Sequence, residues 1–205
     1  MSERYDPFYT GPLLLDHREP WSQTFEREAP LEVEIGFGYG HFLLEYGRAR
    51  PELNVVGIEF RPKLAYQVAD RIARQGRTNL MALRGDAKRH LPTLFAPGSV
   101  QAFHVQFPDP WWKKRHHKRR LVDTELATLF HTLLRPKGRV YLRTDVLDYG
   151  RAMIETFEAG APPFLNLEGP RAFTADDGLG VPSNRERRYL ANGTPVYRLV
   201  YERGE

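Results

Sequence analysis

From residue 31 onward, hydrophobic residues recur with the two periods of regular secondary structure. Segment 31–35 alternates apolar and acidic residues, and segment 54–60 holds a short apolar run, so both are expected to be strands. Segments 41–48 and 62–74 carry apolar residues at helical spacing, and Pro62 suits the first turn of a helix. Strands and helices therefore alternate through this part of the chain.

The same alternation continues toward the C-terminus. Further strands are expected over 79–83, 99–107 and 139–143, and further helices over 121–134 and 147–158. Strands joined through helices connect by right-handed crossovers, which produces a parallel sheet with helices on both faces. The pattern therefore predicts a doubly wound α/β domain with a mostly parallel, Rossmann-like sheet.

The last two strand candidates, 164–167 and 196–201, break this alternation. A polar loop around 176–192 separates them where a helix would otherwise be expected. They can form an antiparallel hairpin at one edge of the sheet, which is a permitted ending for a doubly wound fold. With this hairpin the sheet is expected to have seven strands.

The chain length fits one domain with a short appendage. Residues 1–30 are rich in proline, aromatic and charged residues without a clean period, so we expect a partly flexible arm before a domain over 31–205. The N-terminus lacks the pattern of a signal peptide, and no apolar run approaches the roughly 20 residues that span a bilayer. The chain has no cysteine, which excludes disulfides and thiolate metal sites. We expect a cytoplasmic protein.

Acidic residues stand at the ends of successive predicted strands. Strands two to five end in or are followed by Glu59, Asp86, Asp109 and Asp145, and the first strand runs into the glycine loop 36–40. A single aspartate at a strand end is usually a turn former or a helix N-cap. Ligands of open α/β sheets bind beyond the carboxyl ends of the strands. Four carboxylates in register with a glycine loop therefore predict a ligand site.

The spacing of the glycines separates two classes of cofactor. The dinucleotide fingerprint Gly-x-Gly-x-x-Gly presents amides to a pyrophosphate, whereas this loop reads Gly-x-Gly-x-Gly with Glu34 just before it. A carboxylate there would repel a pyrophosphate but suits the ammonium and sulfonium groups of S-adenosylmethionine. Glu59 is placed to bind a ribose diol, and Asp86 to accept from an adenine amino group. The residues therefore favour the methyl donor over a nicotinamide cofactor.

Positive charge is concentrated in one run. The net charge of +4 says little by itself, but every residue of 113–120 is Lys, Arg or His, and six of them are Lys or Arg. Such a run is often only a solvated face, although six cations can also neutralise several phosphates. Trp111 and Trp112 precede the run and suit stacking on bases, whereas Trp111 fits a core position equally well. His116 and His117 lack a matched third ligand, so no metal site is expected.

The stretch Pro108-Asp109-Pro110-Trp111, followed by the basic run 113–120, resembles the signature of the bacterial tRNA (guanine-N(7)-)-methyltransferases. The glycine loop is shared by many methyltransferases, whereas this signature is highly specific. The resemblance spans nearly the whole chain after residue 30 and implies a class I methyltransferase fold. It also implies S-adenosylmethionine as methyl donor, no metal, and methylation of a guanosine at position 46 of tRNA, in the variable loop.

The resemblance also assigns site residues by position. Contacts to the methyl donor fall on Glu34, Glu59, Asp86 and Asp109, to which the glycine loop adds Gly36 and Gly38, and Asp109 is the catalytic candidate. Substrate contacts fall on Lys113, Asp145, Ser183, Asn184, Arg185 and Glu186. RNA contacts fall on Arg115, His116, His117, Lys118, Arg119 and Arg120. Arg185 departs from the family, which usually has an aromatic residue there, so stacking at this position would use a guanidinium face.

Guanine N(7) carries a free lone pair, so its methylation has no proton to remove. Asp109, Asp145 and Glu186 are therefore assigned to base selection and positioning, not to general-base work. Two alternatives stay open: a non-catalytic RNA-binding protein on a methyltransferase scaffold, and an exocyclic-amine methyltransferase. Enzymes of the latter kind typically carry Asp/Asn-Pro-Pro-aromatic after the fourth strand. The expected partner is tRNA, with no membrane and no obligate protein partner, and the chain is expected to be a monomer or a homodimer.

Overall fold

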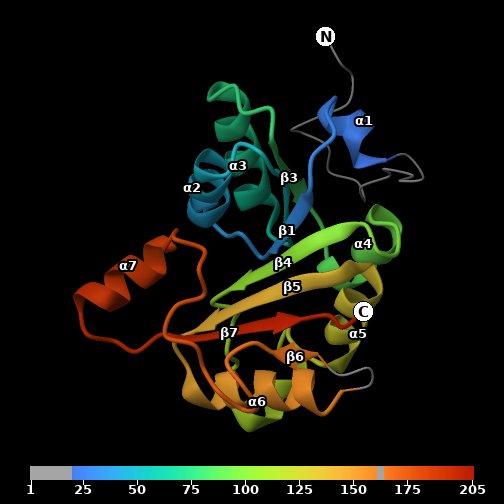
Figure 1. The fold of residues 1–205 in the computed structure, drawn as a ribbon. Helices are drawn as coiled ribbons and strands as arrows, with labels where there is room; N and C mark the ends of the chain where they lie inside the picture. The colour runs from blue at the N-terminus through green and yellow to red at the C-terminus, as the bar shows by residue number, and fades with distance from the viewer. Residues whose placement is uncertain (1–19, 161–163) are drawn as a thin grey trace.

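A computed structural model describes residues 20–160 and 164–205, and a seven-stranded sheet forms its centre (Figure 1). The strands are β1 (Leu31–Ile35), β2 (Asn54–Glu59), β3 (Leu80–Arg84), β4 (Val100–Gln106), β5 (Leu134–Thr144), β6 (Leu165–Asn166) and β7 (Tyr197–Glu202). Their order in the sheet is β3-β2-β1-β4-β5-β7-β6. Strands β1 to β5 run parallel, whereas β7 pairs antiparallel with both β5 and β6. The expected doubly wound sheet with an antiparallel edge is confirmed.

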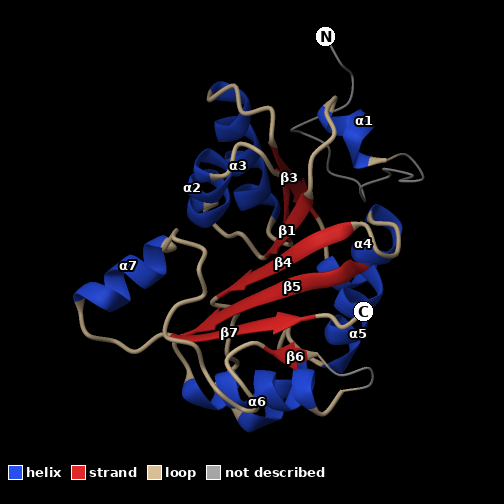
Figure 2. Ribbon diagram, in the orientation of Figure 1, coloured by secondary structure: helices blue, strands red, loops and turns tan. Residues whose placement is uncertain are grey.

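Helices cover both faces of this sheet (Figure 2). They are α1 (Trp21–Phe25), α2 (His41–Ala49), α3 (Pro62–Arg74), α4 (Ala87–Leu94), α5 (Thr124–Leu133), α6 (Leu147–Glu158) and α7 (Asn184–Ala191), with a 3-10 helix η1 (Lys114–Arg119). Helices α2 and α3 build one hydrophobic cluster, while α1, α4, α5 and α6 build a larger one on the other face. Of the helices described, none is long and apolar enough to cross a membrane.

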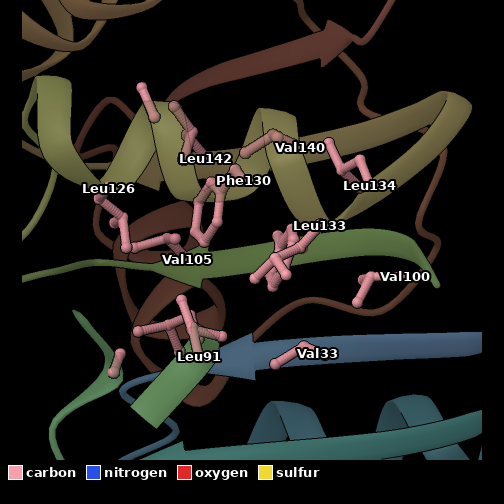
Figure 3. Close-up of a cluster of buried hydrophobic side chains, with 14 of the residues drawn as sticks. Val33, Leu91, Val100, Val105, Leu126, Phe130, Leu133, Leu134, Val140 and Leu142 are labelled. Atoms are coloured by element: carbon pink, nitrogen blue, oxygen red, sulfur yellow. The ribbon is translucent and has the colours of Figure 1, made fainter. Parts of the chain in front are cut away.

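Strand β1 is buried on both faces, as a central parallel strand must be. Its apolar residues enter the larger core, where Val33 lies in one cluster with Phe130 of α5 (Figure 3). Phe130 stacks on Phe103 of β4, with ring centroids 4.0 Å apart. Its acidic residues enter the opposite layer, where Glu32 accepts a 2.9 Å hydrogen bond from Tyr46 Oη and lies 2.7 Å from His104 Nε2. The alternation of 31–35 therefore separates two interiors, one apolar and one polar.

Helices α4 and α5 differ from the expected pattern, and each begins after an aspartate that caps it. Helix α5 begins at Thr124, three residues later than expected from the apolar periodicity, because Asp123 accepts a 3.1 Å hydrogen bond from the Leu126 amide. Helix α4 was not expected at all. Asp86 caps it by accepting from the Arg89 amide, and the short segment contains Pro92, which hides its helical character in the sequence.

The expected polar loop 176–192 is wrong over its second half, which forms α7. Ser183 and Glu186 make a capping box, in which each side chain accepts from the other residue's amide. Strand β5 also begins five residues earlier than the expected 139–143, with an irregular register against β4 between Val100 and Ala102. In Figure 1, α7 lies beyond the end of the sheet at which β4 and β5 finish.

The expected arm 1–30 lies mostly outside the described residues, but its last part packs on the domain. Trp21 of α1 is buried, donates a 2.8 Å hydrogen bond from Nε1 to the Leu94 carbonyl, and stacks on Phe95 at 5.3 Å. Phe25 enters the same core. Helix α1 therefore contributes to the larger hydrophobic cluster.

Replacing Trp21 by alanine should lower the free energy of unfolding by about 3–5 kcal/mol, as removal of a large buried aromatic does. Urea unfolding followed by circular dichroism measures this loss. The exposed Glu28→Ala, in the same segment, is the control and should change stability by less than about 0.5 kcal/mol. Equal and small effects of both changes would mean that α1 is not docked.

Candidate active site

A cavity of about 470 Å³ opens where β1 to β4 end. Ile35 and Ile58 provide its apolar floor, while three acidic side chains, Glu59, Asp86 and Asp109, lie around it. Its volume falls in the range of about 300–1,000 Å³ that is usual for pockets of small molecules. A cavity therefore lies at the edge of the sheet where the strand ends predict a ligand site.

The glycine loop after β1 serves two separate purposes. Gly36, Gly38 and Gly40 all have positive φ, between +57° and +74°, a region that other residues rarely adopt. A Cβ on Gly40 would lie 2.6 Å from Cγ1 of Val68, so this glycine is needed for the close packing of α3. A Cβ on Gly36 would meet no atom within 4 Å, which leaves its backbone open to a ligand.

Glu59 braces this loop. The Glu59 carboxylate is 4% exposed and accepts from the Gly38 amide at 2.8 Å. Its other oxygen accepts from the amide and Nε of Arg61, both at 2.9 Å. The Arg61 side chain is largely exposed and can move aside. A ligand diol at Glu59 would therefore compete with Arg61 and leave the bond to Gly38 in place.

Glu34 is the least satisfied carboxylate of the cavity region. It is fully buried, and its Oε2 has no hydrogen-bond partner among the described residues. Burial and the nearby charge of Glu59 raise the pKa of Glu34 to about 8, although Arg143 acts in the opposite direction. The Leu43 backbone bonds this carboxyl group, so Oε2 alone lacks the partner that nearly all buried polar atoms in folded proteins have.

Asp109 lies where two cavities meet. It lines the large cavity and also a second one of about 360 Å³, whose other walls include Trp112, Lys113 and His116. The side chains of Asp86 and Asp109 are exposed, so both are accessible to a ligand. Asp86 also caps α4, with 3.4 Å between its Oδ1 and the Arg89 amide, and this weak bond leaves its other oxygen free for a ligand.

The basic run folds into η1 and the residues around it. Trp112 is 73% exposed, whereas Trp111 is half-buried beneath the Arg119 guanidinium, 5.0 Å from its ring centre. Arg120 donates to the Pro110 carbonyl at 2.9 Å and lies over the Tyr149 ring. These two arginines help to hold the loop. The exposed cations of the run are Lys113, Lys114, Arg115, Lys118 and Arg119, and the two histidines are half-buried.

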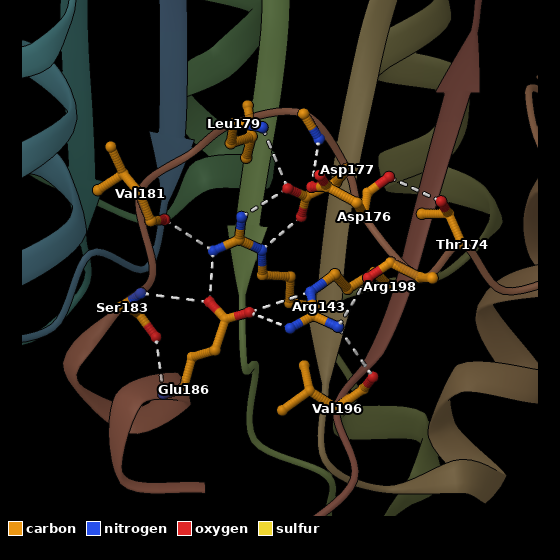
Figure 4. A network of polar contacts seen from close by, with 12 residues as sticks. Arg143, Thr174, Asp176, Asp177, Leu179, Val181, Ser183, Glu186, Val196 and Arg198 are labelled. Carbon is orange, nitrogen blue, oxygen red and sulfur yellow. Dashed lines mark hydrogen bonds and ion pairs between the residues drawn. The ribbon is translucent and has the colours of Figure 1, made fainter. Parts of the chain in front are cut away.

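Glu186 belongs to an internal network (Figure 4). It is 2% exposed, and its carboxylate accepts from Arg143 at 2.6 Å and from Arg198 at 2.5 Å. Arg143 also binds Asp177 through two bonds of 2.5 and 2.7 Å. Ser183 caps α7 in the same cluster. These contacts fasten α7 and the loop before it to the ends of β5 and β7.

The structure thus divides the expected substrate residues into four groups. Lys113 lines the second cavity, and Asp145 lies at the end of β5 paired with Arg185 at 3.3 Å. Ser183 and Glu186 face the internal network, while Asn184 is exposed. The six residues expected to bind the donor all lie at the end of the sheet where β1 to β4 finish, and Glu59, Asp86 and Asp109 share one cavity.

Sequence reasoning missed Arg143 and Asp177. Arg143 ends an apolar strand, and a charge in a buried strand needs charged partners, which is the one signal that could have revealed it. The partner Asp177 lies in a polar loop without any distinguishing pattern. Within the described residues, no three His, Cys, Asp or Glu lie close enough together to hold a metal ion.

Replacing Glu34 by glutamine should stabilise the ligand-free protein, increasingly so at higher pH. The unfolded chain ionises Glu34 near its ordinary pKa of 4.5, whereas the folded protein keeps the proton up to about pH 8. The folded state therefore binds more protons in this window, and its stability falls as the pH rises through it. The gain from Glu34→Gln should be small at pH 4.5, grow toward pH 8 and then level off.

Urea unfolding of both proteins at several pH values between 4.5 and 9 measures this gain. The exposed Glu52→Gln is the matched control and should show no such trend. A gain from Glu34→Gln that is absent or independent of pH would contradict the burial of a protonated carboxyl group.

Comparison with known proteins agrees with this geometry. Residues 28–199 match the family described as putative methyltransferase. Among solved structures, the 16S rRNA methyltransferase KamB is similar with a TM-score of 0.61 at 17% identity, covering 90% of this chain and 93% of that one. The aminoglycoside resistance methyltransferase NpmB1 has a TM-score of 0.56 at 16% identity, covering 89% and 91%. At these identities the likeness shows the class I methyltransferase fold alone.

Curated relatives are much closer in sequence. The tRNA (guanine-N(7)-)-methyltransferase of Anaeromyxobacter dehalogenans is 48% identical over 191 residues, covering 92% of this chain and 94% of that protein. The enzyme of the same name from Myxococcus xanthus is 44% identical over 178 residues, covering 87% and 85%. The chain therefore belongs to the tRNA (guanine-N(7)-)-methyltransferase family.

Proposed function

We propose that the protein transfers a methyl group from S-adenosylmethionine to N(7) of a guanosine in tRNA. The observation that carries the proposal is the cavity beside the glycine loop, which Glu59, Asp86 and Asp109 line, together with the buried Glu34 in the adjoining strand, whose Oε2 has no partner. The names of the close relatives supply the target base and the RNA. Its place in the variable loop, at position 46, and the cytoplasmic location are parts of the same proposal.

The residues fit the chemical groups of the methyl donor. Glu34 and the open backbone at Gly36 suit its cationic amino-acid end, because a buried carboxyl oxygen without a partner, Oε2 of Glu34, favours a cation. Glu59 suits the ribose hydroxyls, and Asp86 the adenine amino group beside the apolar Ile58. When bound, the donor supplies an electrophilic methyl group on a sulfonium.

The protein's own part is mainly positioning and electrostatics. The attacking N(7) lone pair is already free, so no side chain has to remove a proton. Methylation makes the purine cationic, and a carboxylate held nearby favours that developing charge. Asp109 lies at the junction of the two cavities and is the group placed to do this. Asp145, at the end of the next strand, suits the N–H groups on the Watson–Crick edge of guanine.

The same carboxylates repel phosphates, which gives the basic run a complementary role. The exposed Trp112 lines the second cavity together with Lys113 and His116, and Lys114, Arg115 and Lys118 of the same run are exposed. Cations attract the backbone, and an exposed indole stacks on an unpaired base. We therefore assign this loop to holding the tRNA so that the target base reaches Asp109.

Asp109→Asn should lower kcat by about 100-fold, the scale for loss of one electrostatic contact to a transition state. The assay uses labelled S-adenosylmethionine and unmodified tRNA, followed by nucleoside analysis. The control, Asp148→Asn, changes an exposed aspartate in the first turn of α6 and should keep normal activity. An unchanged kcat for Asp109→Asn would remove Asp109 from the mechanism.

The wild-type protein in this assay also separates the competing functions. The proposal predicts 7-methylguanosine as the product. A product of N6-methyladenosine would instead indicate an exocyclic-amine methyltransferase. If equilibrium dialysis detects no binding of the methyl donor, the chain is an RNA-binding protein on a methyltransferase scaffold.

A further inference from the structure

The Arg185 side chain contacts Asp145, Tyr189 and Phe107, and the Tyr189 ring packs edge-on against the same Phe107 ring at 5.9 Å. The Nη2 of Arg185 lies 3.3 Å from Oδ2 of Asp145, and its Nε donates to the Tyr189 hydroxyl at 2.8 Å. Its guanidinium carbon lies 5.5 Å from the centre of the Phe107 ring. A planar cation with several N–H donors is thus held between a carboxylate and an aromatic face.

We propose that the space between the Asp145 carboxylate and the Phe107 ring is the subsite for the target guanine, and that Arg185 fills it in the free protein. This inference rests on the proposed function and adds Phe107 as a stacking partner for the base. The tRNA guanine then enters only when the Arg185 side chain swings out.

The chemistry of the two occupants is alike. A guanidinium presents coplanar N–H donors to a carboxylate, and the Watson–Crick edge of guanine presents N1–H and the N2 amino group in the same way. Both are flat and stack on aromatic rings, and the methylated guanine is also cationic. Side chains that hold a guanidinium here are therefore suited to hold guanine and its product.

Phe107 carries a second, independent sign of function. Its φ is +50°, in the left-handed region that bulky residues avoid, and such conformations gather at functional sites. A 2.8 Å bond from its amide to the Arg143 carbonyl helps to fix this conformation. Phe107 also lines the larger cavity, and Arg185 contacts both its ring and the Asp145 carboxylate. A base stacked there lies beside the place where the methyl group arrives.

Arg185 is able to leave without moving α7. Its side chain is 37% exposed, and its ion pair with Asp145 is long. The next residue, Glu186, is anchored to Arg143 and Arg198 by buried bonds, so the helix backbone stays in place. Arg185 can therefore leave by a rotation of its side chain alone. Because tRNA binds only to molecules with an open subsite, the apparent affinity for tRNA is the intrinsic affinity multiplied by the open fraction.

Steady-state kinetics of Arg185→Ala on unmodified tRNA tests the proposal. Opening the subsite should lower the KM for tRNA by about three- to tenfold, the scale of one exposed ion pair and one cation–π contact, with kcat unchanged. The control is Arg187→Ala, which removes the same charge from an exposed position on α7 and should leave KM unchanged or raise it. In an Asp145→Asn background, Arg185→Ala should change KM by less than twofold.

The possible results separate this inference from the proposed function. If Arg185→Ala raises KM as much as Arg187→Ala or more, Arg185 contacts RNA directly and the inference is overturned. If Phe107→Leu folds normally but keeps the kcat and KM of the wild type, stacking on Phe107 is overturned. If the wild-type protein forms no 7-methylguanosine, the proposed function itself fails, whatever the Arg185 variants do.

Discussion

A carboxylate buried in a protein must find a cation or hydrogen-bond donors, or else keep its proton, and this constraint organises the polar face of the sheet. Glu32 is buried and bonds the side chains of Tyr46 and His104. Glu186 forms ion pairs with Arg143 and Arg198, which anchor α7. Glu34 keeps one oxygen without a partner and stays protonated to about pH 8. Glu32 and Glu186 thus belong to the scaffold, and Glu34 is the buried carboxyl group to which we assign the ligand's cation.

The same constraint explains how α7 is held near the cavity at the ends of the parallel strands. Parallel strands deliver their ends to one edge, so the glycine loop, Glu59 and Asp109 meet there without any further device. Beyond β5 and Asp145, no further parallel strand ends at this edge, because β7 runs antiparallel to both β5 and β6. Buried ion pairs around Arg143 instead hold α7 across this end. A segment of polar sequence thereby acquires a fixed position beside Asp145.

The sequence predicted what depends on periodicity and missed what depends on long-range pairing. The five parallel strands and the helix 147–158 follow from spacing, and so does the acidic rim. Helix α7 was missed because its residues are mostly charged, although its capping box could be recognised in the sequence. Glu186 was expected to contact substrate by family resemblance, a prediction that stands untested, while the structure shows it between two arginines distant in sequence. No local pattern reveals such partners.

The most direct measurement of the role of Glu34 is the proton count on binding of the methyl donor. Calorimetric titration with S-adenosylmethionine at pH 6.5, in buffers of different ionisation enthalpy, gives this count. Because Glu34 holds its proton to about pH 8 in the free protein, binding of a cation beside it should release close to one proton. Glu34→Gln should release none. Binding of the donor to the wild-type protein without proton release would contradict the idea that a buried, unpartnered carboxyl group awaits the ligand's cation.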